Sequence, residues 1–361
     1  MPGIIPEAGR RQATHHGVMY SLLKFRFALA WLLPFWVAWA AGVSPALALW
    51  AVLGYQTALA LTERWPGLRH SPSAMKQTAW HRWCVRAHVP LQAALLAWGL
   101  WLVVDPAGPQ PSLWAVVALG LGVGGVSGSQ GITFAHELGH SRSRLDRSLA
   151  WMLMGSVGYA HFMVEHYRGH HPRAATWDDP ASARRGESLW RFLPRTLAGS
   201  WFSAWRLEAQ QGRQLSRPWL RSTLLLVTVL QVAWLLTLLL WLGPLALIYW
   251  LAQSAYAVFL LEAVNYIEHY GLQRQPQGAR PEPFGVMHAW NADHLLTNCM
   301  VANLQRHSDH HMHAWKPYPE LEALPGPQLP TGYAGCLFLA LVPPLWFAAM
   351  HPRLERLPLT T

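Results

Sequence analysis

Charged side chains are scarce in this sequence. They make up 13% of its 361 residues, whereas hydrophobic residues make up 52%. In a typical soluble domain about a quarter of the residues are charged. This shortage argues against an ordinary soluble protein and favours a protein that lies in a membrane.

Cysteine is almost absent. Cys84, Cys299 and Cys336 form no CxxC pair and have neither zinc-site nor iron–sulfur spacing. The chain therefore has no cysteine-based redox centre of its own. Any electrons that it uses must come from a separate protein or cofactor.

Lysine and arginine are absent from six apolar segments, which are close in length to the about 20 residues that a helix needs to cross a bilayer. We expect membrane-spanning helices at residues 27–42, 45–61, 88–104, 112–135, 222–242 and 244–264. The connections 43–45, 105–111 and 243–244 also lack basic residues, so all 28 fall on the other side of the membrane. Because basic residues near spans are retained in the cytoplasm, the N- and C-termini are predicted to be cytoplasmic.

The net charge of +10 has the same origin. The basic residues gather on the predicted cytoplasmic face, where they favour contact with anionic membrane lipid. We therefore interpret the charge as a topology signal and expect no nucleic-acid partner.

These segments predict an all-α fold, a six-helix transmembrane bundle with a cytoplasmic histidine-rich helical cap. The expected parts are a basic cytoplasmic tail (1–26), the bundle (27–264) with a cytoplasmic insertion (136–221), and a C-terminal cytoplasmic cap (265–361). The apolar stretch 331–350 is not counted as a span, because Pro343 and Pro344 would break a helix there. We expect it to form a hairpin against the cap.

Histidine, in contrast, is abundant, with 19 residues. Nine of them fall in the motifs HELGH, EHYRGHH, NYIEHYG and LQRHSDHH, at or just beyond the predicted cytoplasmic ends of spans. They are His136, His140, His166, His170, His171, His269, His307, His310 and His311.

The spacing of these histidines predicts metal ligands. Residues four apart on a helix lie on one face, which would pair His136 with His140, His166 with His170, and His307 with His311. We expect the extra neighbours His171 and His310 to reach a second metal nearby. Two ions with four or five nitrogens each would use all nine rings, and imidazole suits iron, copper, zinc and nickel.

Acidic residues next to these motifs are expected to accept the second ring N–H of ligating histidines, which fixes the orientation of the rings. These acids are Glu137, Glu165, Glu268 and Asp309. Four further histidines lie near the motifs, and their roles stay open between substrate contact and support of the ligands: His161, His288, His294 and His313.

Two chemistries fit such a centre. In a membrane zinc protease, His136 and His140 would bind zinc and Glu137 would be the general base, but at least six histidines would then have no role. In a dinuclear iron centre, dioxygen would be activated at the membrane surface, where an apolar substrate enters from lipid. Cleavage of an unactivated C–H bond needs such a metal, because no amino-acid side chain can perform it.

The motifs HELGH, EHYRGHHPRAATWDDPASARRGES, NYIEHYGL, WNADHLLTN, LQRHSDHH and PQLPTGYAG resemble those of the bacterial integral-membrane alkane 1-monooxygenases. That family belongs to the membrane fatty-acid desaturase and hydroxylase superfamily, which includes the xylene monooxygenases. The likeness covers about residues 130–350 well and the first two spans only by pattern. The WDD run at 177–179 departs from the family pattern, and we expect it to touch no ligand.

The resemblance implies an inner-membrane di-iron enzyme whose two irons are held by the nine histidines, with no tightly bound flavin or haem. It implies that dioxygen and two electrons convert the terminal methyl group of an n-alkane into a primary alcohol. The electrons would come from rubredoxin, which is reduced by NAD(P)H through rubredoxin reductase. Related enzymes that act on aryl methyl groups or desaturate fatty acyl chains stay open as alternatives.

Two further sets of residues are predicted to contact the substrate and the electron carrier. Trp50 and Tyr55 in the second span are candidates for the closed end of a substrate slot. A basic cytoplasmic surface is a candidate docking face for an acidic carrier, because charge complementarity raises association rates. It includes Arg184, Arg185, Arg191, Arg195 and Lys316.

Overall fold

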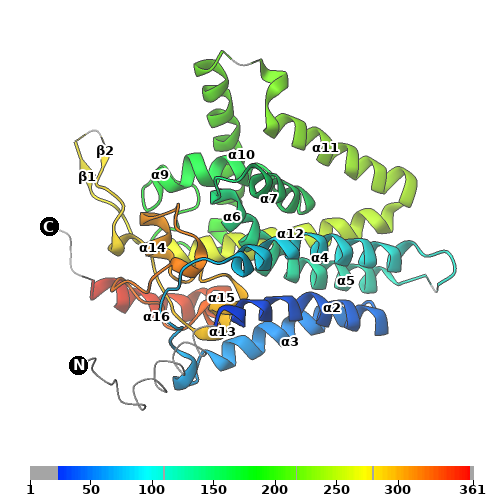
Figure 1. Ribbon diagram of the computed structural model, residues 1–361, viewed down its shortest axis with the longest axis horizontal. Helices are drawn as coiled ribbons and strands as arrows, with labels where there is room; N and C mark the ends of the chain where they lie inside the picture. Colours follow the sequence, from blue (N-terminus) through cyan, green and yellow to red (C-terminus); the bar gives the residue numbers. More distant parts are fainter. Residues whose placement is uncertain (1–22, 109, 217, 279, 358–361) are drawn as a thin grey trace, which may run out of the picture.

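The structure is a computed structural model that describes residues 23–108, 110–216, 218–278 and 280–357. Most of the predicted basic tail, residues 1–22, lies outside this range. The N-terminal half of the described chain is entirely helical (Figure 1). Its elements are η1 (Lys24–Trp31), α2 (Leu32–Val43), α3 (Leu47–Thr62), η2 (Pro66–Leu68), α4 (Ala79–Val104), α5 (Leu113–Val126), η3 (Ser127–Ile132), α6 (Thr133–His140) and α7 (Arg144–Ser156).

The C-terminal half begins with short helices that carry histidines and continues into long ones. The first of its elements are α8 (Phe162–Glu165), η4 (His166–His170), α9 (His171–Arg173), α10 (Leu189–Gln214), η5 (Trp219–Arg221), α11 (Thr223–Thr237), η6 (Leu238–Leu242) and α12 (Pro244–His269). A two-stranded hairpin, β1 (Pro276–Gln277) and β2 (Arg280–Pro281), follows. The chain then forms η7 (Val286–His288), α13 (Leu295–Met300), α14 (His307–Met312), η8 (Tyr318–Glu320), α15 (Tyr333–Leu341) and α16 (Pro343–Glu355).

Five helical stretches of the described chain are long and apolar enough to cross a membrane, which confirms the predicted helical membrane fold. They are Lys24–Val43, Ala79–Val104, Leu113–His140, Thr223–Leu242 and Pro244–His269. The span predicted at 45–61 is the 16-residue helix α3, which is about 24 Å long at 1.5 Å per residue and shorter than the hydrocarbon core. Six crossings therefore stay a prediction.

The helices α2, α3, α4, α5 and α12 run side by side, and α10 rises away from them (Figure 1). The stretch Thr223–Leu242 descends from the top of α10, and only 11% of its apolar window is buried. A helix that exposes so much leucine and valine needs an apolar solvent, because exposed apolar patches of this size are rare in soluble proteins. The outer surface of this helix thus fits a lipid environment.

Two helices extend past the predicted apolar segments. The helix predicted from residue 88 begins at Ala79. Its N-terminus is capped by Thr78 and His81, whose Nδ1 accepts a hydrogen bond from the Thr78 backbone N–H at 3.0 Å, as in a capping box. Likewise, α5 continues through the π-helical η3 into α6, so that HELGH ends the same continuous helix.

Glycines set the closeness of α5 and α12. Gly120, Gly124 and Gly128 recur every four residues, and a Cβ at each would meet the α12 backbone at Tyr249, Gln253 and Ala257 at 2.5–2.8 Å. Small residues with this spacing let two helices approach closely in a membrane. The contact holds the helix that ends in His140 against the helix that ends in His269.

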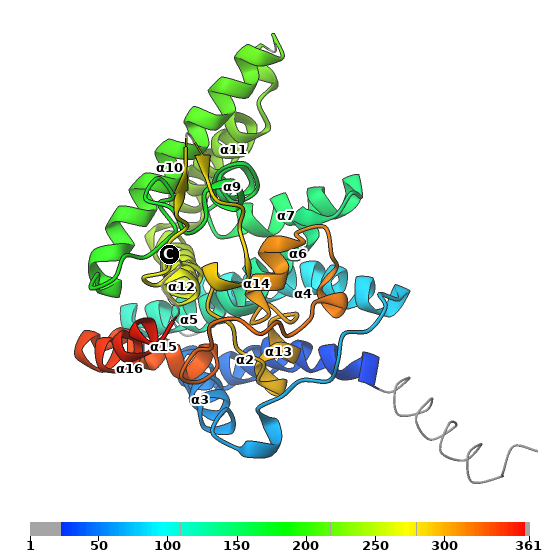
Figure 2. The same cartoon turned by 90° about the vertical axis from the view of Figure 1, so that its left-hand side faces the viewer.

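The C-terminal apolar stretch forms two helices that are broken as the prolines predict. α15 ends at Leu341 and α16 begins at Pro343. The first helix packs against α3 and α12, so the pair covers the histidine-bearing end of the bundle, which faces the viewer in Figure 2.

We expect Gly124→Ala to destabilise the protein by about 1–3 kcal/mol, because the added methyl group must push two backbones apart. Gly54→Ala on α3 is the matched control, since a Cβ there has no atom within 4 Å and alanine favours a helix over glycine. Thermal unfolding in detergent measures both variants. Equal midpoints for Gly124→Ala and wild type would contradict the close-contact role.

Candidate metal centre

All nine histidines of the four motifs lie together at one end of the bundle, in two adjacent groups. The five-histidine group consists of His136, His140, His166, His171 and His310. The four-histidine group consists of His170, His269, His307 and His311. Within each group the candidate ligand atoms lie within 4.8 Å of one another. Among the described residues, neither group includes a carboxylate or a cysteine.

The nitrogen–nitrogen distances fit a shared ion. Donors about 2.1 Å from one ion are about 3.0–3.4 Å apart at right-angled or tetrahedral geometry. In the five-histidine group, His171 Nε2 lies 3.1 Å from His140 Nε2 and 3.0 Å from His166 Nε2. In the four-histidine group, the Nε2 atoms of His307 and His269 are 3.2 Å apart.

The two groups are in direct contact. The rings of His171 and His311, one from each group, have their centroids 4.5 Å apart. His136 Nε2 and His310 Nε2 are buried without a hydrogen-bond partner in the described chain. Because a buried unpaired nitrogen is costly, these two atoms favour a ligand inside the five-histidine group. The all-imidazole donor set of each group fits iron, copper, zinc or nickel.

The local helix type decides which histidines share a group. The prediction that His166 and His170 share a site is wrong, because residues 166–170 form the π-helix η4. A π-helix places residues five apart, rather than four apart, on one face. His166 therefore joins His171 in one group, while His170 belongs to the other. In the ordinary helices α6 and α14, His136 shares a group with His140, and His307 with His311.

Five of the rings outside the spanning helices have a pKa below the ordinary value. Burial, followed by the charge of neighbouring imidazoles, lowers the pKa well below the ordinary value of 6.5 at His166, His171, His307, His310 and His311. A neutral ring offers a lone pair to a metal, whereas a protonated ring does not. The burial that makes these side chains poor bases keeps them ready as ligands.

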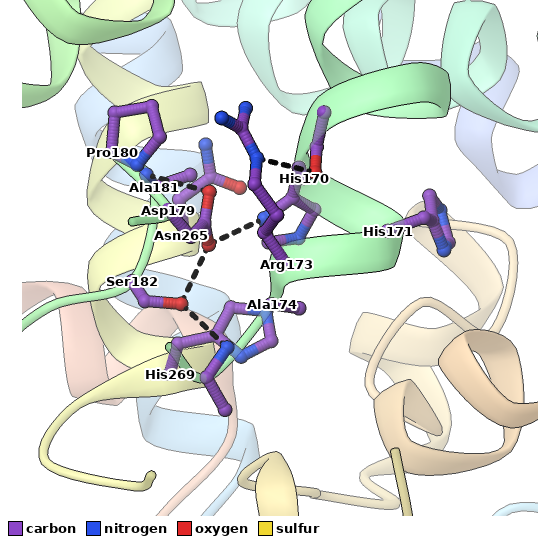
Figure 3. Close-up of polar contacts among 12 residues, drawn as sticks. His170, His171, Arg173, Ala174, Asp179, Pro180, Ala181, Ser182, Asn265 and His269 are labelled. Atoms are coloured by element: carbon purple, nitrogen blue, oxygen red, sulfur yellow. Dashed lines mark hydrogen bonds and ion pairs between the residues drawn. The ribbon is translucent and has the colours of Figure 1, made fainter. Parts of the chain in front are cut away.

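Asp179 orients His170, a contact that the sequence prediction missed. Figure 3 shows His170 turned toward Asp179 and His171 pointing the other way. His170 Nδ1 donates to Asp179 Oδ2 at 2.9 Å, and Ser182 Oγ donates to the same oxygen at 2.6 Å. Burial alone would raise the pKa of Asp179, but His170 and these hydrogen bonds lower it to about 2. The carboxylate thus fixes the ring so that Nε2, 3.3 Å from His311 Nε2, faces the four-histidine group.

The expectation that the WDD run touches no ligand is therefore wrong. Asp179 lies nine positions after His170, and no helical periodicity links them, because turns at residues 174–175 and 177–178 intervene. The only signal in the sequence was an acid within the motif-rich stretch after EHYRGHH.

Of the four acids predicted to support ligands, Glu268 lies beside a ligand ring. Its Oε1 is 3.2 Å from His307 Nδ1 and accepts a hydrogen bond from the Tyr333 hydroxyl at 2.6 Å. The structure places the other three in different contacts. Glu137 accepts from the Tyr318 backbone, Glu165 pairs with Arg173, and Asp309 pairs with Lys316 and His313.

The four histidines whose roles stayed open lie outside both groups. His288 pairs with Glu282 at 3.1 Å and His313 with Asp309 at 2.6 Å. His161 is buried against Tyr159 and Trp201, and His294 lines a separate cavity near the end of α3. These contacts favour a structural role for the four histidines outside the two groups.

An apolar cavity leads to the metal ligands, and we call it the inner cavity. His136, His166 and His307 line it, together with Tyr55, Leu59, Leu260 and Leu337. It follows α12 from Glu268 back to Leu260, about 12 Å along the helix axis. Tyr55, one of the two predicted slot residues, is in this wall. Trp50 is not, because its side chain is 63% exposed on the outer surface.

The predicted docking residues do not form one free basic surface. Arg185 pairs with Glu355, Arg195 with Glu187, and Lys316 with Asp309. Arg184 lies over the Trp177 ring, and Arg191 is exposed. Lys316 also lines a polar cavity with Arg82, Arg142 and the ligand His140, which makes it the member nearest to the histidine groups.

Comparison with known proteins adds the family context. Residues 111–334, which include all nine histidines, match the fatty acid desaturase family. The chain is 41% identical to alkane 1-monooxygenase 2 of Pseudomonas aeruginosa over 78% of this chain and 75% of that protein. It is 39% identical to alkane 1-monooxygenase 1 of the same organism over 74% of this chain and 71% of that protein. It is 30% identical to the hydroxylase component of xylene/toluene monooxygenase of Pseudomonas putida over 64% of this chain and 62% of that protein.

We expect Asp179→Asn to weaken metal binding at the four-histidine group by about 10–100-fold, because the amide no longer fixes the charge and orientation of His170. Titration with iron(II) against a competing chelator measures this loss, which should affect about half of the bound metal. Asp178→Asn is the matched control, since Asp178 is exposed. Wild-type affinity in Asp179→Asn would contradict the orienting role.

Proposed function

Because this chain belongs to the fatty acid desaturase family and, within it, to the alkane 1-monooxygenases, we propose that it hydroxylates the terminal methyl group of n-alkanes to 1-alkanols. The reaction consumes dioxygen, two electrons and two protons, and it releases one water. The observation that carries the proposal is the inner cavity, an apolar channel that ends on histidines of both groups.

The residues of the inner cavity favour an unbranched apolar chain as substrate. Nine of the 22 residues in its wall are leucine, isoleucine, valine or phenylalanine, and His136, His166 and His307 lie at its histidine end. An alkyl chain in this channel gains contact along its length and places one end at the metal ligands. The narrow passage therefore selects a chain end rather than an internal carbon, as in pockets that fix orientation by shape.

We propose that each histidine group holds one iron ion. Iron bound there would supply the activation of dioxygen and the oxidation of the methyl group, which side chains cannot perform. The chain itself keeps the rings buried, orients His170 through Asp179, places Glu268 beside His307, and surrounds the site with apolar residues that exclude water. The zinc-protease alternative lacks support, because Glu137 is bound to the Tyr318 backbone and the family comparisons favour oxidation.

We propose rubredoxin as the electron donor, with rubredoxin reductase and NAD(P)H upstream. The three cysteines of the chain are all buried and apart from the histidine groups, so the chain needs an external carrier. The polar cavity lined by His140, Arg82, Arg142 and Lys316 supports docking at this end of the bundle. This end would face the cytoplasm of the inner membrane, as the distribution of basic residues predicts.

A second candidate substrate is an aryl methyl group. It is favoured by the 30% identity to the hydroxylase component of a xylene/toluene monooxygenase. The higher identity of 41% to an alkane 1-monooxygenase and the length of the inner cavity favour an alkane. Desaturation of a fatty acyl chain has no supporting observation beyond the family.

The direct test is reconstitution of the purified, iron-loaded protein with rubredoxin, rubredoxin reductase and NADH, and a panel of octane, hexadecane, xylene and a fatty acyl substrate. We expect octane or hexadecane to give the 1-alkanol, and His310→Ala to abolish it with loss of bound iron. Turnover by His310→Ala at full iron content would refute that ligand, and product from xylene alone would favour the second candidate.

The docking face is tested by the salt dependence of turnover. A rise in the apparent KM for rubredoxin with ionic strength would support the basic docking face, and a flat response would count against it.

We expect Tyr55→Ala to lengthen the alkanes that the enzyme accepts, because the smaller side chain opens the wall of the inner cavity. Each further methylene that becomes buried contributes about 0.8 kcal/mol, or about fourfold in kcat/KM. Trp50→Ala is the matched control on the same helix, since Trp50 faces outward. A chain-length profile that is unchanged in Tyr55→Ala, or changed equally in both variants, would contradict this role.

A further inference from the structure

A second large cavity lies on the opposite side of α3 and α15 from the inner cavity, and we call it the outer cavity. Its volume is about 890 Å³. Thr57, Ala60 and Leu61 of α3 line it, whereas Tyr55, Gln56 and Leu59 of the same helix line the inner cavity. The two cavities are thus separated by the helix itself.

Glu63 closes the wall between the two cavities. Its carboxylate accepts hydrogen bonds from Thr297 Oγ1 at 2.7 Å and from the Gly335 backbone at 2.8 Å. Thr297 lines the inner cavity, and Gly335 lines the outer one. Because buried polar links of this kind are rigid, the outer cavity is a separate site and not an entrance to the inner cavity.

The outer cavity is apolar on one side and cationic on the other. Leu61, Phe338 and Leu339 form the apolar side, and Arg64, Arg69 and His70 lie at the cationic side. Among the described residues, neither arginine forms an ion pair with an acid. The Arg69 guanidinium donates a hydrogen bond to the Arg64 backbone carbonyl at 3.5 Å.

The acids of this cavity already accept hydrogen bonds from other donors. Glu63 is held as described above, and Asp293 accepts from Arg306 at 2.8 Å, from Asn298 at 3.0 Å and from the Ser71 backbone at 3.1 Å. The unpaired charge that the cavity presents is therefore positive. His294 adds a buried Nδ1 without a hydrogen-bond partner in the described chain.

The surroundings of the outer cavity fit the boundary between hydrocarbon and headgroups. Leu61 is 61% exposed and Trp65, beside Arg64, is 68% exposed, and tryptophan with arginine at a span end is typical of that boundary. The cavity opens at the histidine-bearing end of the bundle, which the basic residues predict to be cytoplasmic, where the leaflet is rich in anionic lipid.

We propose that the outer cavity is a binding site for an anionic phospholipid. The phosphate group lies between Arg64 and Arg69, and an acyl chain lies along Leu61 and Phe338. Arginine suits this role because its guanidinium donates to two phosphate oxygens at once. The site goes beyond the proposed hydroxylation, since it lies outside the inner cavity and needs neither iron nor alkane.

Binding of soluble dioctanoyl lipids to the purified, iron-loaded protein tests this proposal by calorimetry. Dioctanoyl phosphatidylglycerol should bind with a stoichiometry of one, and dioctanoyl phosphatidylcholine at least tenfold more weakly. Glycerol phosphate, which has the charge but no chains, should show no binding. Arg64→Gln and Arg69→Gln should each weaken phosphatidylglycerol binding about fivefold.

Two further variants separate a built site from general surface charge. The double variant Arg213→Gln, Arg221→Gln removes the same charge from exposed arginines elsewhere and should bind the lipid like wild type. Ala60→Trp fills the cavity without a change in charge and should abolish binding of the lipid. A normal helical spectrum and iron content confirm that each variant is folded.

Several outcomes would overturn the proposal. These are equal binding of phosphatidylcholine and phosphatidylglycerol, binding of glycerol phosphate as tight as that of the lipid, equal loss in the Arg213, Arg221 control, or full binding by Ala60→Trp. Binding of the 1-alkanol product in place of the lipid would also overturn it and would assign the cavity to product. Because binding is measured without turnover, failure here leaves the proposed hydroxylation untouched.

Discussion

The structure depends on the burial of nine imidazoles in one place. Each ring must lose its contact with water, and several ring nitrogens then have no partner in the described chain, among them His136 Nε2, His310 Nε2 and His311 Nδ1. Unpaired buried nitrogens destabilise a fold, and rings crowded at centroid distances of 4.4–5.0 Å cannot all carry charge. Metal ions that took up the lone pairs would make the arrangement favourable, so the residues that weaken the metal-free fold are the candidate metal ligands.

The rest of the fold serves to hold these rings in place. The glycine stripe of α5 brings the helix of His136 and His140 against the helix of His269, and the π-helical turn at His166 divides its three histidines between the two groups. Asp179 orients His170 through Nδ1, and the Glu268 carboxylate lies 3.2 Å from His307 Nδ1.

The three cavities around this centre differ in polarity, and each polarity follows from the helices that form it. The inner cavity is apolar because it runs inside the bundle. The polar cavity beside His140 lies where the start of α4, the end of α6 and the start of α7 meet, and it is lined by Arg82, Arg142 and Asp146. The outer cavity joins both kinds of surface, because α3 ends there with Leu61 on one side and Arg64 on the other. A chain-like substrate, an electron carrier and a membrane lipid would then reach the protein from three separate directions.

The sequence alone determined the helical membrane fold and the nine candidate ligands, because apolar length and the clustering of histidines are local properties of the chain. It also indicated the family through long motifs around those ligands. It could not assign His166, His170 and His171 to their groups, since a π-helical turn depends on how tertiary packing accommodates one extra residue. Nor could it place Asp179 against His170, or tell that Tyr55 faces inward and Trp50 outward on one apolar helix. Those placements depend on contacts between elements. Because α3 is apolar on all sides, only its neighbours in the folded protein decide which side faces the cavity.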